Sequence, residues 1–401
     1  MAEYLTPDVY VEEVPAGPRP IQAVGTRTAA FIGRAPLGGA RPNEAYPVNN
    51  WLQFMREYVG GSGAGTVLST AVYGFFQNGG SRCFIVNTAD DDPVAGGPAG
   101  GGLRALEAED EVAIVAAPGR TDAASYDAML SHCENLRDRV AILDGPLRTD
   151  DIGALTRVTT RVRAAQERRR ADTDKPGQRP RASDGGYGAF YFPGITTPDP
   201  ITGELVDAPP SGHVAGIWAR NDSVRGVHKA PANELVRGAL NVTQRLTFEE
   251  QGVLNPAGVN CIRYFPREGI RVWGARTLAD AASEWRYLNV RRLFNMVEES
   301  IAEATRWIVF EPNDRTLWKS IRRDIGAFLT RVWRDGALMG RTAEQAFFVK
   351  CDEETNPPDV IDAGMVIAVI GLAPVKPAEF VIFRISQTAG GVEIETEGQG
   401  A

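Results

Sequence analysis

The sequence predicts an α/β fold: a parallel-rich sheet with flanking helices, followed by a smaller α+β domain. Between residues 112 and 193, short continuous apolar runs alternate with helix-length segments, the pattern of parallel strands that are buried on both faces. After residue 283, two amphipathic helices precede strand-like segments, an order typical of an α+β unit. The length of 401 residues, with 43% hydrophobic and 23% charged residues, suits two or three globular domains.

Residues 1–20 are predicted to be an N-terminal exchange arm. A short β-prone stretch, which includes Val9, Tyr10, Val11 and Val14, is ended by closely spaced prolines. So short a stretch cannot bury a core of its own. We therefore expect it to pair with the edge of a sheet.

Residues 21–282 are predicted to form the α/β domain. The expected strands are residues 28–33, 82–87, 112–117, 140–144 and 188–193, and the expected helices are residues 51–58, 69–79, 122–137 and 150–170. Two segments of biased composition, 89–110 (Gly-rich) and 167–186 (Arg- and Gly-rich), are predicted to be flexible.

Residues 283–376 are predicted to form the C-terminal domain. Apolar residues recur at helical spacing over 283–310, and Asp314 is expected to cap a second helix that Gly336 ends. Strands are expected at 346–351, 365–372 and 379–386. The last of these begins the C-terminal strand and tail, 377–401, and its apolar residues need a partner edge: Phe380, Val381, Ile382, Phe383 and Ile385.

No catalytic, cofactor-binding or metal-binding motif is found. The sequence lacks a phosphate loop of the G-x-x-x-x-G-K-[ST] type, a G-x-S-x-G elbow and an H-E-x-x-H pair. The glycine-rich run 60–65 follows a helix-like segment, whereas a dinucleotide fingerprint follows a strand. The four cysteines are widely spaced and are expected to be buried free thiols. An α/β enzyme, for instance a hydrolase, remains an alternative if a pocket near residues 188–228 gathers polar groups around His213 and His228.

The net charge and the hydropathy limit the kinds of partner that the protein is expected to bind. A net charge of −8 argues against binding to nucleic acid or to an anionic membrane surface. The most apolar segment, 364–373, is shorter than the ~20 residues that span a bilayer, so direct membrane insertion is not expected. The first residues do not form a signal-peptide pattern, which favours the cytoplasm as the place of synthesis and assembly.

Several segments, in chain order, resemble contractile phage tail sheath proteins, a family that includes the sheath subunits of myophage tails, R-type bacteriocins and contractile injection systems. Two characteristic stretches read Tyr4-Leu-Thr-Pro-Asp-Val-Tyr-Val and Phe310-Glu-Pro-Asn-Asp. The matching segments are residues 4–14, 28–33, 71–87, 254–260, 269–278, 287–293, 310–314, 351–358 and 377–383.

The resemblance implies a subtilisin-like sheath domain, a C-terminal sheath domain and extended terminal arms. It implies a helical or stacked-ring homopolymer around an inner tube protein, bounded by baseplate and terminal cap proteins. In the family, the arms of one subunit complete a sheet in its neighbours, and the sheath ejects the tube by switching from a metastable extended lattice to a contracted one. No cofactor is implied. Another component of the same tail or baseplate is a second alternative.

A basic stripe is expected on the helix that begins after Asp314. Arg315, Lys319, Arg322 and Arg323 follow one another at i, i+4, i+7 and i+8 and so share a face. In the family, a helix of the C-terminal domain faces the inner tube, which implies that this stripe holds an acidic tube surface. The alternative is a solvated basic face.

Overall fold

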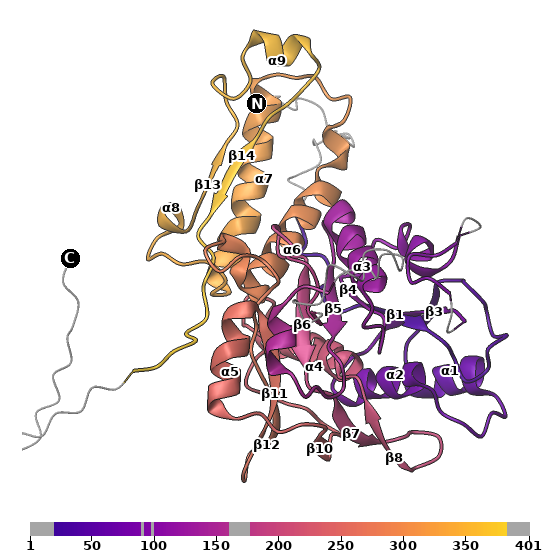
Figure 1. Ribbon diagram of the computed structural model, residues 1–401. Helices are drawn as coiled ribbons and strands as arrows, with labels where there is room; N and C mark the ends of the chain where they lie inside the picture. The colour runs from indigo at the N-terminus through magenta and orange to yellow at the C-terminus, as the bar shows by residue number, and fades with distance from the viewer. Residues whose placement is uncertain (1–19, 90–91, 98–99, 160–176, 383–401) are drawn as a thin grey trace, which may run out of the picture.

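The computed structural model describes residues 20–89, 92–97, 100–159 and 177–382. Within these residues the chain forms a large α/β domain and a smaller C-terminal domain that projects from it (Figure 1). The main sheet has the strand order β2-β3-β1-β4-β5-β6-β11-β12-β9. Its strands are β1 (Ala29–Gly33), β2 (Tyr46–Val48), β3 (Cys83–Asn87), β4 (Ile114–Ala116), β5 (Val140–Asp144), β6 (Gly188–Phe192), β9 (Glu234–Leu235), β11 (Val259–Phe265) and β12 (Gly269–Trp273).

The centre of the sheet is parallel, as predicted. The neighbouring strands from β3 through β1, β4, β5 and β6 to β11 pair in parallel, and β2 and β12 join the edges antiparallel. Successive residues of β1 enter different cores: Phe31 packs into one hydrophobic cluster and Ile32 into the other. Burial on both faces is why these strands are continuously apolar.

Helices cover both faces of the sheet. α2 (Val67–Gln77) and α4 (Ser211–Arg225) contribute to one hydrophobic cluster, and α3 (Ala123–Leu136) contributes to the other. Glycine lets α2 and α4 touch closely, because a Cβ at Gly216 would lie 2.4 Å from the carbonyl oxygen of Phe75. The remaining elements of this domain are α1 (Trp51–Phe54), which continues into a π-helical turn (Met55–Val59), α5 (Phe248–Leu254), and a small sheet of β7 (Ile195–Pro198), β8 (Leu205–Ala208) and β10 (Asn241–Val242).

The C-terminal domain is built on two long helices. α6 (Leu288–Ala304) and α7 (Arg315–Arg334) share a third hydrophobic cluster with the sheet residues that follow them. The carboxylate of Asp314 accepts a hydrogen bond from Leu317 N (2.8 Å) and caps α7, and Gly336 (φ +82°) follows its end, as predicted. The other elements are α8 (Ala343–Ala346), β13 (Phe347–Lys350), α9 (Pro358–Asp362) and β14 (Val369–Leu372).

The helix expected over residues 150–170 is wrong for the part that can be described. A short 3-10 turn covers Ile152–Thr156, and the backbone of Arg157 is then extended. The reason is long-range: Thr159 N and Arg179 O form a backbone hydrogen bond of 2.7 Å, and Val158 bridges to Arg179. Residues 160–170 lie outside the described ranges.

The expectation of flexibility over 89–110 is also wrong for the described residues. Val94, Leu103 and Leu106 are buried in the cluster that α3 covers. Gly102 has φ +53°, and a Cβ there would lie 2.4 Å from the carbonyl oxygen of Val94. The glycines of this segment therefore serve tight turns and close backbone approach.

The end of the second segment expected to be flexible, residues 177–186, is packed as well. The hydroxyl of Ser183, which is fully buried, donates to Glu134 (2.7 Å) and accepts from Tyr187 N (3.1 Å). Residues 167–176 of that segment lie outside the described ranges. All four cysteines are buried free thiols, as predicted. In the described ranges, no helix is both long and apolar enough to cross a bilayer.

Candidate intersubunit interface

The C-terminal domain carries a small, partly exposed sheet. In the described part of the chain, β13 and β14 form a two-stranded antiparallel sheet, with Phe347 opposite Leu372. One face packs on α7, while the other is open to solvent, with Phe348 55% exposed. A two-stranded ribbon is marginal by itself, and its outer edges carry backbone groups that can pair with a further strand.

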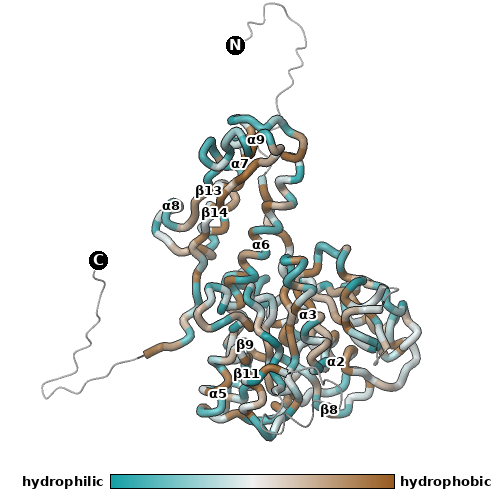
Figure 2. Tube along the Cα trace, turned by 45° about the horizontal axis from the view of Figure 1, so that its top comes forward, coloured by the Kyte–Doolittle hydropathy of each residue, from teal (hydrophilic) through white to brown (hydrophobic). Residues whose placement is uncertain are grey.

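The described chain ends in an exposed apolar segment. Phe380, Val381 and Ile382 are 71%, 70% and 80% exposed, and they form no strand. Figure 2 shows this hydrophobic stretch projecting clear of both domains. The other predicted residues of the C-terminal strand, Phe383 and Ile385, lie outside the described ranges. The predicted arm residues also lie outside them: Val9, Tyr10, Val11 and Val14.

The first described residues pack against the C-terminal domain, and we call residues 21–26 the root of the N-terminal segment. Ile21 is 2% exposed and belongs to the cluster of α6 and α7. Val24 N donates to the hydroxyl of Ser300 (3.0 Å), and the guanidinium of Arg331 donates to the carbonyl oxygen of Ile21. The α/β domain was predicted to begin at residue 21. That boundary is wrong, because the apolar side chains of the first described residues are buried against the C-terminal domain.

A buried ionic contact ties this root to both domains. Asp222 of α4 accepts hydrogen bonds from both terminal nitrogens of Arg292 of α6 (3.0 and 2.6 Å) and from the hydroxyl of Thr26 (2.6 Å). The two charged side chains are only 2–3% exposed. Arg292 also donates to the carbonyl oxygen of Thr26 (2.9 Å), and its guanidinium lies 4.7 Å from the ring centroid of Trp218. We call this set the Asp222–Arg292 contact.

A second ionic contact holds the root of the C-terminal segment. Glu379 accepts hydrogen bonds from Arg276 Nε and Nη2 (2.8 and 2.7 Å), Asn255 (3.0 Å) and Tyr287 (3.3 Å). Burial alone would raise the pKa of Glu379, but the hydrogen bonds from Arg276 and Asn255 outweigh it and lower the pKa. Four residues earlier, Val375 N still pairs with the C-terminal domain. The chain thus crosses from one domain to the other just before its exposed end.

Sequence reasoning did not find these contacts. Asp222 and Arg292 are 70 positions apart, and Arg276 and Glu379 are 103 apart, so no local spacing joins them. One signal was available. Arg292 follows Leu288 by four positions, which places a charge on the apolar face of a predicted helix, and a buried charge demands a partner.

The basic stripe of α7 lies on the surface. Arg315, Lys319 and Arg323 are exposed, and Arg322 is half-buried. The opposite face of the helix is buried: Leu317, Trp318, Ile321, Ile325, Phe328, Leu329 and Val332. Arg315 pairs with Glu353 (2.7 Å) at an exposed position, where such pairs contribute little. Arg323 pairs with Asp324 (2.9 Å), whose side chain is only 10% exposed.

Two side chains of the region considered for an enzyme site, His213 and Ser211, are buried in the core. His213 is 1% exposed, and among the described residues neither of its ring nitrogens has a hydrogen-bond partner. Burial lowers the pKa of His213 to about 4. The hydroxyl of Ser211 donates to Asp144 (2.6 Å), and both side chains are buried. This pair joins the end of β5 to the start of α4, away from solvent.

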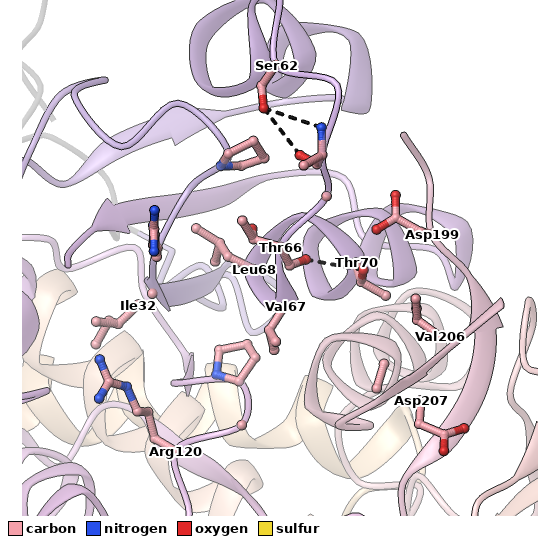
Figure 3. A pocket seen from close by; sticks show the side chains of 18 residues that line it. Ile32, Ser62, Thr66, Val67, Leu68, Thr70, Arg120, Asp199, Val206 and Asp207 are labelled. Carbon is pink, nitrogen blue, oxygen red and sulfur yellow. Dashed lines mark hydrogen bonds between the residues drawn. The ribbon is translucent and has the colours of Figure 1, made fainter. Parts of the chain in front are cut away.

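A cleft of about 760 Å³ lies where the 60–65 loop leads into α2 (Figure 3). Several of its polar groups are already hydrogen-bonded within the subunit. Thr66 accepts from Ser69 N (3.2 Å) as the cap of α2, Thr70 donates to the carbonyl oxygen of Thr66 (3.2 Å), and Asp199 accepts from Ile201 N (2.8 Å). The loop follows the π-helical turn, as its sequence context predicted, and not a strand.

Comparison with known proteins agrees with this architecture. The profile described as phage tail sheath protein central domain matches residues 95–278, and that of the phage tail sheath C-terminal domain matches 280–388. The tail sheath protein of Vibrio phage KVP40 is 31% identical over 185 residues, covering 45% of this chain and 26% of that protein. That of Salmonella phage ViI is 28% identical over 260 residues, covering 63% and 40%. The chain thus spans less than half the length of these two curated relatives.

Solved structures match nearly the whole chain. The sheath complex of the PVC extracellular contractile injection system, in its contracted state, has a TM-score of 0.76 and 30% identity, covering 97% of this chain and 99% of that one. The contracted helical sheath of the anti-feeding prophage has a TM-score of 0.75 and 30% identity, covering 95% and 99%. The fold, matched over nearly its whole length, is that of a sheath-type subunit. The chain belongs to the contractile tail sheath family.

Proposed function

We propose that this chain is the structural subunit of a contractile sheath, which polymerises around an inner tube and drives the tube out by contracting. The proposal rests on two complementary features of the described chain. A two-stranded sheet lacks outer strands, and an apolar chain end lacks a sheet. In a polymer of this chain, the apolar segment of one copy can add a strand to the sheet of the next copy. Strand addition then supplies main-chain hydrogen bonds between subunits.

The terminal residues are assigned to this exchange. Residues Val9, Tyr10, Val11 and Val14 of one copy, and Phe380, Val381, Ile382, Phe383 and Ile385 of another, add to the edges of β13 and β14. Each contact joins different surfaces of successive copies, so it does not close and builds a helical or stacked-ring polymer. The match to a chain of the anti-feeding prophage baseplate structure, with TM-score 0.73, supports contact with a baseplate at one end. A terminal cap protein closes the other end.

Contraction needs subunits that move as units while their connections persist. The two ionic contacts at the roots hold each terminal segment to its own subunit, so rigid bodies can rotate while the exchanged strands stay paired. Energy is stored at assembly in a metastable extended lattice. The subunit acts mechanically and carries out no reaction. An α/β hydrolase in the middle domain is not favoured, because His213 is buried and Ser211 is bonded to Asp144 away from solvent.

The inner tube is assigned to the exposed face of α7. Arg315, Lys319, Arg322 and Arg323 present a basic stripe to which an acidic tube surface can bind. Exposed ion pairs are individually weak, which suits a contact that must release on firing. The particle is assembled in the bacterial cytoplasm and belongs to a phage tail or a tail-like particle.

The test is polymerisation of the purified chain, observed by negative-stain electron microscopy. The full chain should form hollow striated cylinders. Chains lacking residues 1–18 or 383–401 should stay folded, with an unchanged circular dichroism spectrum, and should form no cylinders. Cylinders that persist in either deletion would refute the strand exchange. A full chain that remains monomeric at high concentration would refute the polymer itself.

A further inference from the structure

The turn between α6 and α7 presents a phenylalanine to solvent. The side chain of Phe310 is 103% exposed, and that of Val309 is 64% exposed. The backbone of Phe310 has φ +73°, a conformation that bulky residues rarely adopt. Two backbone hydrogen bonds of 3.0 Å, Glu311 N to Ile308 O and Asp314 N to Pro312 O, fix the turn. Packing within the described part of the subunit accounts neither for the exposed ring nor for the strained backbone.

A pocket that suits this ring lies at the other end of the same helix pair. Its volume is about 590 Å³, and we call it the base pocket. Apolar side chains form most of its wall: Ile21, Val24, Val227, Leu293, Met296, Phe328, Val332 and Ala337. Charged side chains lie around it, namely Arg225, Arg331 and Asp335.

Phe310 cannot reach the base pocket of its own subunit. The turn precedes Arg315, the first residue of α7, whereas the pocket is lined near the end of that helix, which is Arg334. A helix of 20 residues is about 30 Å long. In Figure 1 the turn lies beside α9, at the end of the C-terminal domain remote from the sheet. The ring and the pocket thus sit at opposite ends of one rigid helix pair.

We propose that Phe310 of one copy inserts into the base pocket of a second copy, a contact that rests on the proposed polymer and adds to its strand exchange. Charge supports a second copy as the occupant. Glu311, an exposed acidic residue next to Phe310, is complementary in charge to Arg225 and Arg331, which line the base pocket. The contact joins two different surfaces and therefore repeats along a line of copies without closing. The C-terminal domains then stack tip to base.

Disulfide trapping tests the proposed pair of sites. Phe310→Cys is made in one chain and Val227→Cys in another, and the two chains are mixed, polymerised and oxidised. The four native thiols are buried, so they do not compete. A disulfide forms only if the two Cα atoms lie within ~7 Å of each other. Phe248→Cys replaces Phe310→Cys in the control, because Phe248 is also an exposed phenylalanine (83%) but lies in α5 of the other domain.

A second measurement covers the case in which a cysteine variant fails to fold or assemble. Phe310→Ala removes a ring that makes no contact within the subunit, so the soluble chain should keep its stability. Loss of a central aromatic anchor should raise the critical concentration for polymerisation roughly thirtyfold. Phe248→Ala should leave that concentration unchanged.

Each outcome has a defined meaning. A disulfide with Phe310→Cys and none with Phe248→Cys supports the contact. Wild-type polymerisation of Phe310→Ala overturns it. Impaired polymerisation with no disulfide overturns the base pocket as the binding site and assigns the ring to another surface, such as the tube. Failure of the unmodified chain to polymerise would instead refute the proposed function.

Discussion

Replacing Arg292 by methionine should destabilise the subunit severely. The change keeps the length of the side chain but leaves the carboxylate of Asp222 without its cation, at a site where both side chains are 2–3% exposed. Breaking a buried ion pair by removing one partner typically costs about 3–5 kcal/mol. The stacking of Arg292 on Trp218 adds roughly 1–2 kcal/mol more. We therefore expect a loss of about 4–7 kcal/mol, close to the entire stability of many domains.

Urea unfolding below the polymerisation concentration measures this loss. Circular dichroism and the total emission of the seven tryptophans, which lie in both domains, follow the unfolding. Arg315→Met is the matched control, because Arg315 pairs with Glu353 and both side chains are exposed (76% and 64%), so the expected loss is below about 1 kcal/mol. The double variant Asp222→Leu with Arg292→Met should regain most of the lost stability, since an apolar pair can replace a buried ion pair.

Two results would refute this reasoning. A loss below about 1 kcal/mol for Arg292→Met would mean that water reaches the contact and screens it. A double variant no more stable than the single one would mean that the hydrogen bonds to Thr26, and not the uncompensated charge, dominate.

Two further predictions concern the other charged sites. Glu379 has a lowered pKa in the folded protein, so its contribution to stability is present above the ordinary carboxyl pKa and is lost as the pH falls through the folded-state value. In urea unfolding between pH 3 and 7, Glu379→Gln should therefore reduce the loss of stability toward acid pH. An unchanged pH dependence would contradict this role of Glu379. Arg322→Gln with Arg323→Gln should leave polymerisation of the sheath alone intact but reduce its co-assembly with the tube. The reduction should be strongest at low salt, because salt screens the wild-type contact as well. Normal co-assembly at all salt concentrations would contradict the tube assignment.

Secondary-structure elements that are determined by residues close together in the sequence could be predicted. The strands of the main sheet are continuous apolar runs because both faces are buried, and a run such as Ala29–Gly33 shows this directly. Helix α7 was located by its apolar spacing and by Asp314 at its start. These features depend on residues within one or two turns of one another.

Elements whose cause is distant were not predictable. Residues 150–159 have a composition compatible with helix, but a short 3-10 turn ends at Thr156, and backbone hydrogen bonds with Arg179 hold the residues after it extended. The glycines near Gly102 suggested flexibility, although the fold uses them for turns that only glycine adopts easily. Of the predicted interface, the sequence identified the apolar chain end but not the ionic contact at Glu379 that fixes its origin.

The roots of the two terminal segments have a mechanical consequence for the proposed polymer. Residues 21–24 begin in the core of the C-terminal domain before the chain enters the α/β domain, and the chain later leaves the C-terminal domain to anchor at Arg276 of the α/β domain. Tension on either segment therefore acts across the junction of both domains. The Asp222–Arg292 contact spans that junction and is buried, so it resists such tension far better than an exposed pair would. The domains of one subunit should then move together, and the change between lattices must take place at the exchanged strands and at the surfaces between copies.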